Sequence, residues 1–305
     1  MSDMKLGLML GYWGSTPPTH HIQMAQQAEA LGYDSVWTAE AYGSDAITPL
    51  AWIGAQTSKI RLGTGICQIS ARTPTAMAMA ALTMDHLSNG RMILGLGVSG
   101  PQVVEGWYGA PFSKPLARTR EYIDIIRQVL ARENPVSNDG EHYPLPFTGE
   151  GSWGLGKPLK PIVHPLRADL PIMMGAEGPK NVALAAEIAD GWLPLYYSPF
   201  RQDVYSASLS NAKADFEVTQ GLVVNITDDE EKGLIPIKHM LALYIGGMGA
   251  KDRNFHKELI GRMGFEAEAE KIQDLYLAGK KDEAAMAVPT TLADEISLVG
   301  SVDKI

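Results

Sequence analysis

Short apolar runs recur along the first hundred residues and begin near residues 5, 34, 60 and 92. Each run is apolar almost throughout, which is typical of parallel strands that are covered on both faces. Between each run and the next, apolar residues recur at helical spacing. This alternation predicts successive βαβ units and therefore an α/β fold.

Capping residues mark where the helices between these runs are expected to begin. Strands are predicted over 4–10, 34–40, 60–67 and 92–98. Thr19, the pair Thr48–Pro49 and the pair Thr73–Pro74 are each predicted to start a helix, because threonine caps well and proline is tolerated at the first helical position. Gly32 is predicted to end the first of them.

The second half of the chain is less regular. A helix is predicted over 116–131, and residues 134–169, rich in glycine and proline, are predicted to form an irregular insertion. Alternation returns with strands over 170–176, 191–197 and 216–226 and a helix over 180–189, and residues 255–299 are predicted to be mainly helical. The length fits either two average domains or one large α/β barrel, and a single barrel domain over 1–305 is predicted. Only seven strands are found where a (β/α)8 barrel needs eight. The eighth strand is not identifiable in the sequence.

Composition limits the classes of partner. The net charge of −9 and the pI near 5.3 argue against nucleic acid or an anionic membrane as partner. The single cysteine, Cys67, cannot form an internal disulfide, and no window approaches the ~18 apolar residues of a membrane span. No H-x-x-x-H or C-x-x-C pair suggests a metal site. A cytoplasmic protein that acts on a small molecule is expected.

Gly95, Gly97 and Gly100 have the G-x-G-x-x-G spacing of a dinucleotide-binding turn. In a Rossmann domain this motif follows the first strand, and an acidic residue comes about twenty positions later. Here it follows the fourth strand, the segment near residue 120 is an amphipathic helix, and Pro101 removes an N–H from the phosphate-binding turn. Two interpretations stay open: the glycines permit a tight turn, or the backbone here approaches a flat cofactor.

The order and spacing of several motifs resemble the bacterial luciferase-like superfamily and, within it, the coenzyme F420-dependent oxidoreductases of the methylenetetrahydromethanopterin reductase-like subgroup. The similar segments are "LGYDSVWTAEAYGSDA" (31–46), "IRLGTGICQISARTP" (60–74), "LSNGRMILGLGVSGPQVVEGWYG" (87–109), "DGEHYPLP" (139–146), "PIMMGAEGPKNVALAAEIADGW" (171–192) and "ALYIGGMGAKDRNF" (242–255). The resemblance implies a (β/α)8 TIM barrel with insertions and a homodimer. It places the active site at the carboxyl ends of the strands.

The resemblance also implies a candidate catalytic residue. Related enzymes often carry an Asp-His pair after the second strand, where this chain has Ala39–Glu40. A carboxylate in a closed apolar pocket can serve as a general acid, so Glu40 is the predicted proton donor. The alternatives are a solvated loop carboxylate and a structural ion pair.

Three strand ends are implied to bind the cofactor. The family's non-prolyl cis peptide is placed by matching at Gly65–Ile66, behind the deazaflavin ring. Cys67 is expected to be a core hydrophobe rather than a nucleophile. The loop after the fifth strand is implied to bind the cofactor phosphate through amide groups at a helix start and a lysine, with Glu177 pointing away. The full set is Gly65, Ile66, Cys67, Gln68, Val98, Ser99, Gly100, Gln102, Gly175, Ala176, Glu177, Gly178, Pro179 and Lys180.

Aromatic residues near strand ends are candidates for the substrate side of the site or, alternatively, for closing the core. They are Trp13, Tyr42, Trp107, Tyr108, Tyr196 and Tyr197. Arg253 and Asn254 recur in the subgroup, and dimer packing is the alternative to a role at the site.

The function implied is hydride transfer between reduced coenzyme F420 and a small organic carbonyl, imine or activated alkene. The alternatives are an FMN-dependent luciferase-like monooxygenase and a non-catalytic flavin-binding relative.

Overall fold

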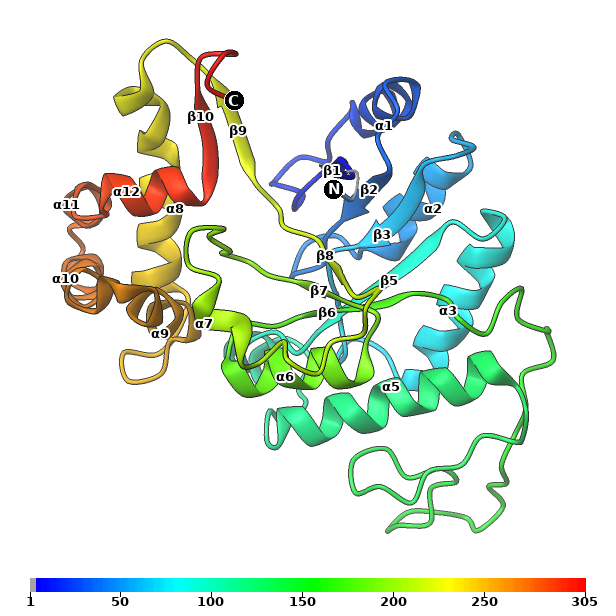
Figure 1. Ribbon diagram of the computed structural model, residues 1–305. Coiled ribbons are helices and arrows are strands. Elements are labelled where there is room, and N and C mark those ends of the chain that lie inside the picture. Colours follow the sequence, from blue (N-terminus) through cyan, green and yellow to red (C-terminus); the bar gives the residue numbers. More distant parts are fainter. Residues whose placement is uncertain (1–3) are drawn as a thin grey trace. The chain divides into compact units, whose positions relative to one another are not determined.

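The computed structural model describes residues 4–305, and these form two compact units (Figure 1). The first unit comprises the chain up to Gly175 together with Glu187–Leu193 and Asp215–Glu217. The second comprises Ala176–Ala186, Pro194–Ala214 and Val218–Ile305. The single domain predicted over 1–305 stays a prediction.

A parallel sheet forms the centre of the first unit. Its strands follow the order β1-β2-β3-β5-β6-β7-β8, and the short β4 pairs with β5. The four residues of β2 and the six of β5 are all buried, as their continuous apolar character predicts for strands covered on both faces. The bounds are β1 Gly7–Met9, β2 Ser35–Thr38, β3 Arg61–Thr64, β4 Cys67–Gln68, β5 Met92–Gly97, β6 Ile172–Gly175, β7 Gly191–Leu193 and β8 Glu217–Val218.

Helices connect these strands in the predicted alternation. Figure 1 shows α1, α2, α3 and α5 lined along one face of the sheet. In α5 the buried residues recur at helical spacing, so an apolar stripe faces inward. The bounds are α1 His21–Ala30, α2 Ile47–Gly54, α3 Pro74–Leu87, α4 Pro101–Gly106, α5 Pro115–Ala131, α6 Pro179–Ile188 and α7 Asp203–Ser206.

The predicted helix starts are confirmed in one case and wrong in two. The Thr73 side chain accepts from the Ala76 amide, 3.4 Å away, and caps α3 as expected. Thr19 does not begin a helix, since α1 starts at His21. Helix α2 starts at Ile47 rather than at Thr48, because Asp45 Oδ1 accepts from the first amide groups at 2.8–2.9 Å.

The irregular insertion over 134–169 is confirmed. It contains no helix or strand, and its regular pairing is limited to two isolated antiparallel bridges. They join Val136 to Leu159 and Asn138 to Leu145.

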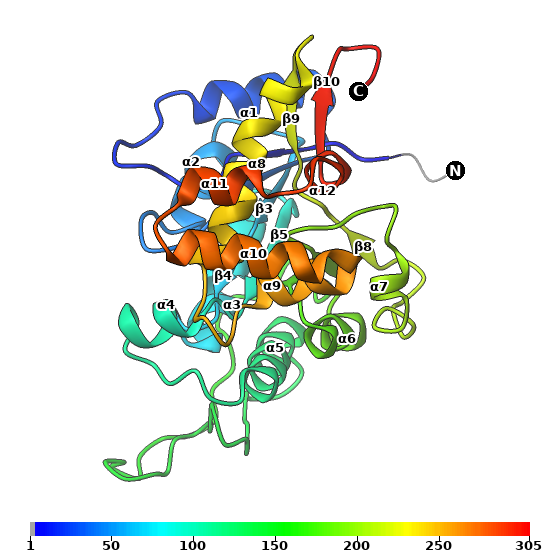
Figure 2. The ribbon, with the colours of Figure 1, turned by 90° about the vertical axis from the view of Figure 1, so that its left-hand side faces the viewer.

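The second unit contains a two-stranded parallel ribbon and most of the C-terminal helices. Strand β9 (Val223–Ile226) pairs in parallel with β10 (Ser297–Gly300). Figures 1 and 2 show α10 and α11 beside the long α8. The helices are α8 Glu230–Gly247, α9 Phe255–Ile260, a π-helical turn Gly261–Phe265, α10 Glu266–Leu277, α11 Lys281–Met286 and α12 Thr290–Glu295.

The strand missing from the sequence prediction is β10. Its first three residues lie in the stretch 255–299 that is predicted to be mainly helical, because β10 begins two residues after the end of α12 and shows no alternation of its own. The single strand predicted over 216–226 is also wrong, since the structure divides it into β8 and β9. Within residues 4–305, β9 and β10 form a two-stranded sheet that is separate from the sheet of β1 to β8.

In the part of the chain that the structure describes, every helix is too short or too polar to span a bilayer.

Candidate functional site

A pocket of about 270 Å³ lies in the first unit, at the carboxyl ends of β2 and β4. This is the end of the strands where (β/α)8 enzymes carry their active sites. Four residues singled out from the sequence line it together: Glu40, Tyr42, Trp107 and Tyr108. The full lining is Glu40, Ala41, Tyr42, Gly43, Ser44, Asp45, Ala71, Arg72, Trp107 and Tyr108, so Trp13 is not part of it.

Glu40 is buried at the wall of this pocket and is surrounded by donors. Its carboxylate lies 2.8 Å from Arg72 Nη1 and accepts from the Gln68 amide at 3.1 Å and the Ala46 amide at 3.4 Å. Only 4% of Glu40 is exposed. Contacts of this kind suit a charged carboxylate. The Glu40–Arg72 contact therefore matches the structural ion pair given above as an alternative role for Glu40. The role of Glu40 as proton donor stays a prediction.

Arg72 is the pocket residue that sequence reasoning missed. It also lies 3.5 Å from Asp45, so one guanidinium bridges two carboxylates. Burial alone would lower the pKa of Arg72, but the hydrogen bond and the charge of Glu40 raise it above its ordinary value. The signal in the sequence is a lone arginine in the short connection between β4 and the Thr73 cap of α3.

The peptide bond Gly65–Ile66 is cis, as the resemblance implied. This bond lies between β3 and β4, and the Ile66 side chain packs against the ends of β5 and β6. A Cβ built on Gly97 would lie 2.9 Å from Ile66 Cδ1, and one built on Gly175 would lie 3.2 Å from Ile66 Cγ2. The glycines at the ends of β5 and β6 therefore make room for Ile66.

Packing, and not a dinucleotide turn, accounts for the first two glycines of the G-x-G-x-x-G segment, Gly95 and Gly97. A Cβ on Gly95 would overlap the carbonyl oxygen of Thr64 in the adjacent β3. The positive φ of 59° falls on Ser99, whereas Gly100 has a φ of −108° and precedes α4 as its N-cap. Val98, Ser99 and Gly100 are partly buried and Gln102 is exposed, and their contact with cofactor stays a prediction.

Gln68 and Cys67 lie behind the pocket in the core of the first unit. Gln68 Nε2 donates to the carbonyl oxygens of Glu40 and Ala41 at 3.2 and 3.3 Å. Its Oε1 is buried and has no hydrogen-bond partner within residues 4–305. A buried acceptor of this kind is costly unless another group supplies a donor, so it fits a site completed by a ligand.

We expect Cys67 to resist thiol reagents in the folded protein. Cys67 is fully buried, and burial, together with the charge of Glu40, raises the pKa of its thiol to about 12. Ellman's reagent at about pH 8 should react with it only after unfolding in guanidinium, because the thiolate is the reactive form. Rapid reaction of the native protein would contradict the interpretation of Cys67 as a core residue.

In the second unit, the loop 176–180 leads into α6. Glu177 Oε2 lies 2.8 Å from His256 Nδ1, and the Glu177 carbonyl accepts from Arg262 at 3.2 Å. Lys180 is exposed and has no ion-pair partner among the residues described, and a Cβ on Gly178 would meet no atom within 4 Å. Pro179, the first residue of α6, has no N–H, and the Asn181 and Val182 amides donate to the Gly178 carbonyl oxygen at 2.9 Å. The loop therefore offers an anion chiefly the Lys180 side chain and the open space at Gly178.

The two candidate tyrosines of the second unit are packed against other rings. Tyr196 is 3% exposed, and its ring lies 5.6 Å from that of Tyr244 in an edge-to-face contact. Tyr197 stacks on Tyr205 at 5.5 Å. For Tyr196 this burial matches the alternative of core closure.

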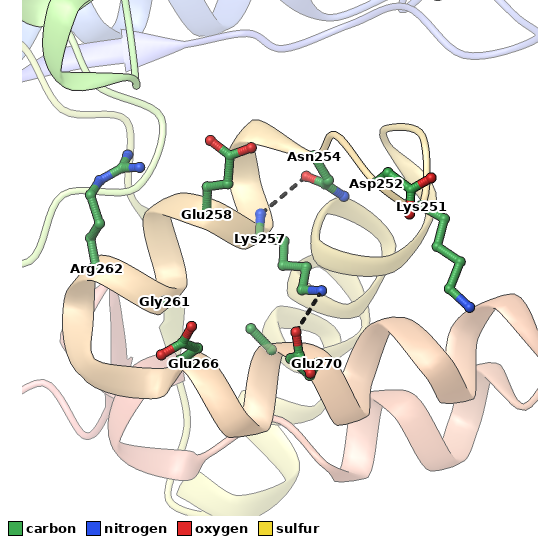
Figure 3. Close-up of a pocket in the computed structure, with 10 residues that line it drawn as sticks. Lys251, Asp252, Asn254, Lys257, Glu258, Gly261, Arg262, Glu266 and Glu270 are labelled. Carbon is green, nitrogen blue, oxygen red and sulfur yellow. Dashed lines mark hydrogen bonds and ion pairs between the residues drawn. The ribbon is translucent and has the colours of Figure 1, made fainter.

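A second cavity, of about 670 Å³, lies in the second unit around α9, the π-helical turn and α10 (Figure 3). Its side chains mix both charges, and Lys257 pairs with Glu270 at 3.3 Å. The lining is Lys251, Asp252, Asn254, Lys257, Glu258, Gly261, Arg262, Glu266, Ala269 and Glu270.

Asn254 makes hydrogen bonds inside the second unit. The sequence left open a role at the site or in dimer packing for this residue. Its Oδ1 accepts from the amides of His256 and Lys257 at 2.9 and 3.0 Å and so caps α9. Its Nδ2 donates to the last turn of α8, at Tyr244 and Ile245.

Among residues 4–305, no three or more His, Cys, Asp or Glu side chains are grouped so that they could hold a metal ion.

Comparison with curated proteins finds relatives along the whole chain. The chain is 59% identical to "Putative coenzyme F420-dependent oxidoreductase Rv3520c" of Mycobacterium tuberculosis, over 100% of this chain and 90% of the relative. It is 27% identical to the 5,10-methylenetetrahydromethanopterin reductase of Archaeoglobus fulgidus, over 91% of this chain and 81% of that protein.

Solved structures agree on the fold. The coenzyme F420-dependent tetrahydromethanopterin reductase of Methanopyrus kandleri has a TM-score of 0.77 at 24% identity, covering 98% of this chain and 87% of that one. An F420-dependent secondary alcohol dehydrogenase has a TM-score of 0.74 at 15% identity, with the same coverage. At these identities the likeness is one of fold, and it confirms the predicted (β/α)8 fold class. Residues 5–305 also match the luciferase-like monooxygenase family. The chain therefore belongs to the luciferase-like family.

Proposed function

We propose that this protein is a coenzyme F420-dependent oxidoreductase that transfers hydride between the reduced cofactor and a small organic substrate. The observation that carries the proposal is the 59% identity, along the entire chain, to a relative named as an F420-dependent oxidoreductase. Relatives at lower identity are named as methylenetetrahydromethanopterin reductase and as F420-dependent glucose-6-phosphate dehydrogenase. The resemblance further supports a cytoplasmic homodimer.

The residues present fit such a cofactor in each unit. In the first unit, the cis peptide at Gly65–Ile66 and the unpartnered Gln68 Oε1 lie at the strand ends where the ring would be held. In the second unit, the Lys180 side chain supplies the positive charge that a phosphate needs, and Gly178 leaves open space beside it. When bound, a deazaflavin supplies hydride chemistry with little reactivity toward oxygen.

Within this proposal, the Glu40–Arg72 pair fixes the wall of the pocket. Every contact to the Glu40 carboxylate is a donor, an arrangement that holds the side chain in place. The exposed rings of Tyr42 and Trp107 are then the surfaces that a small substrate would meet in the first unit.

We expect the purified protein to bind coenzyme F420 at least about tenfold more tightly than FMN, a difference of about 1.4 kcal/mol. The measurement is a side-by-side titration of one preparation with the two cofactors, followed by quenching of tryptophan fluorescence. Trp107, which lines the pocket, is 64% exposed and available as a reporter. The matched variant is Trp107→Phe, because the quenching that it loses relative to the wild type is the part that comes from Trp107.

A preference for FMN would contradict the proposal and favour the monooxygenase alternative, which the family match also admits. Failure to bind either cofactor would contradict both enzyme functions.

A further inference from the structure

Glu177 is held from two sides by one short segment of the second unit. His256 Nδ1 lies 2.8 Å from its carboxylate, and Arg262 Nη2 donates to its carbonyl oxygen at 3.2 Å. The side chains of Glu177 and His256 are only 15% and 18% exposed. This acidic side chain sits two residues before the first residue of α6, inside the loop assigned above to the cofactor phosphate.

The imidazole that meets Glu177 is itself fixed by its surroundings. The Asn254 cap accepts from the His256 amide, and Asn254 also donates to the carbonyl oxygens of Tyr244 and Ile245. The ring of His256 lies 4.9 Å from that of Tyr244, edge to face. A continuous set of contacts therefore runs from the end of α8 through His256 to Glu177.

A carboxylate beside the start of a helix is attracted to its amide groups, which carry partial positive charge. Released from His256, the Glu177 carboxylate would compete with a phosphate for the same donors and would repel it. The charge of Glu177 is thus compatible with an anion site only while another group holds that side chain.

We propose that His256 is a positioning residue of the anion-binding loop. It engages the Glu177 carboxylate and so leaves the start of α6 to the cofactor phosphate. This inference rests on the proposed function, because it deepens the assignment of loop 176–180.

The test compares the affinity for coenzyme F420 of the wild type and four variants, measured by tryptophan quenching. His256→Ala and His256→Phe both remove the Nδ1 contact to Glu177, and phenylalanine keeps an aromatic ring against Tyr244 should the alanine variant fail to fold. Each should weaken binding at least about tenfold. His256→Asn retains a donor near the position of Nδ1, so its affinity should stay within about threefold of the wild type.

The double variant Glu177→Gln/His256→Phe separates positioning from a structural role. Removing the negative charge should restore the affinity to within about threefold of the wild type. Unchanged affinity in His256→Ala and His256→Phe, or no recovery in the double variant, would overturn the inference while leaving the proposed function intact. A wild type that does not bind F420 would instead overturn the proposed function, and this inference with it.

Discussion

Replacing Arg72 with methionine is expected to destabilise the protein by about 3–5 kcal/mol, because it leaves a buried carboxylate without its cation. Glu40 is 4% exposed and lies 2.8 Å from the guanidinium. The two amides that also contact Glu40 cannot replace a full positive charge. The free energy of unfolding, measured by urea denaturation followed by circular dichroism, tests this expectation.

Two further variants show whether the loss comes from the buried charge. Glu40→Gln/Arg72→Met should recover most of the stability, since the glutamine oxygen can still accept from the amides and carries no charge. Lys114→Met removes a pair whose side chains are 58% and 68% exposed, so it should cost less than about 1 kcal/mol. If Arg72→Met were as mild as Lys114→Met, the pair would not be holding the pocket wall.

The central alternation of strands and helices could be predicted from the sequence because its cause is local. A strand such as β5, buried along all its residues, must be apolar throughout, and this is visible in one short window. The Thr73 cap is equally local, since the side chain and the amide it satisfies are three residues apart.

Features that depend on distant partners could not be read in this way. Arg72 contacts Glu40, which lies 32 positions earlier, and no residue near Arg72 in the sequence indicates that contact. Helix α2 shows the same limit on a smaller scale. Asp45 and Thr48 are both good capping residues, and only the backbone path decides that Asp45 accepts the amide bonds.

The candidate site came from the resemblance more than from pattern. Neither composition nor periodicity indicates a cis bond at Gly65–Ile66, although the structure has one there. His256 was not singled out at all, because a lone histidine at a helix start gives no local sign of a glutamate 79 positions earlier.

Substitution of Gly95 by alanine is expected to destabilise the protein by more than about 3 kcal/mol, through overpacking between two buried strands. The added Cβ would overlap the carbonyl oxygen of Thr64 and approach Leu193 Cδ1 to 2.9 Å. Thr64 Oγ1 and the Gly95 backbone also exchange two hydrogen bonds of 2.9 Å, so β3 and β5 cannot separate without losing them. Urea denaturation of the purified variant, or its loss from the soluble fraction, measures the effect.

Gly106→Ala is the matched control for this glycine. A Cβ there would meet no atom within 4 Å, and the position lies in α4, so alanine should be neutral or stabilise by up to about 1 kcal/mol. A Gly95→Ala protein as stable as Gly106→Ala would show that Gly95 is not required for packing. The glycine spacing of this segment would then be explained by a ligand. Substituting a glycine that serves only to let the backbone approach a cofactor would weaken cofactor binding without lowering the stability of the protein.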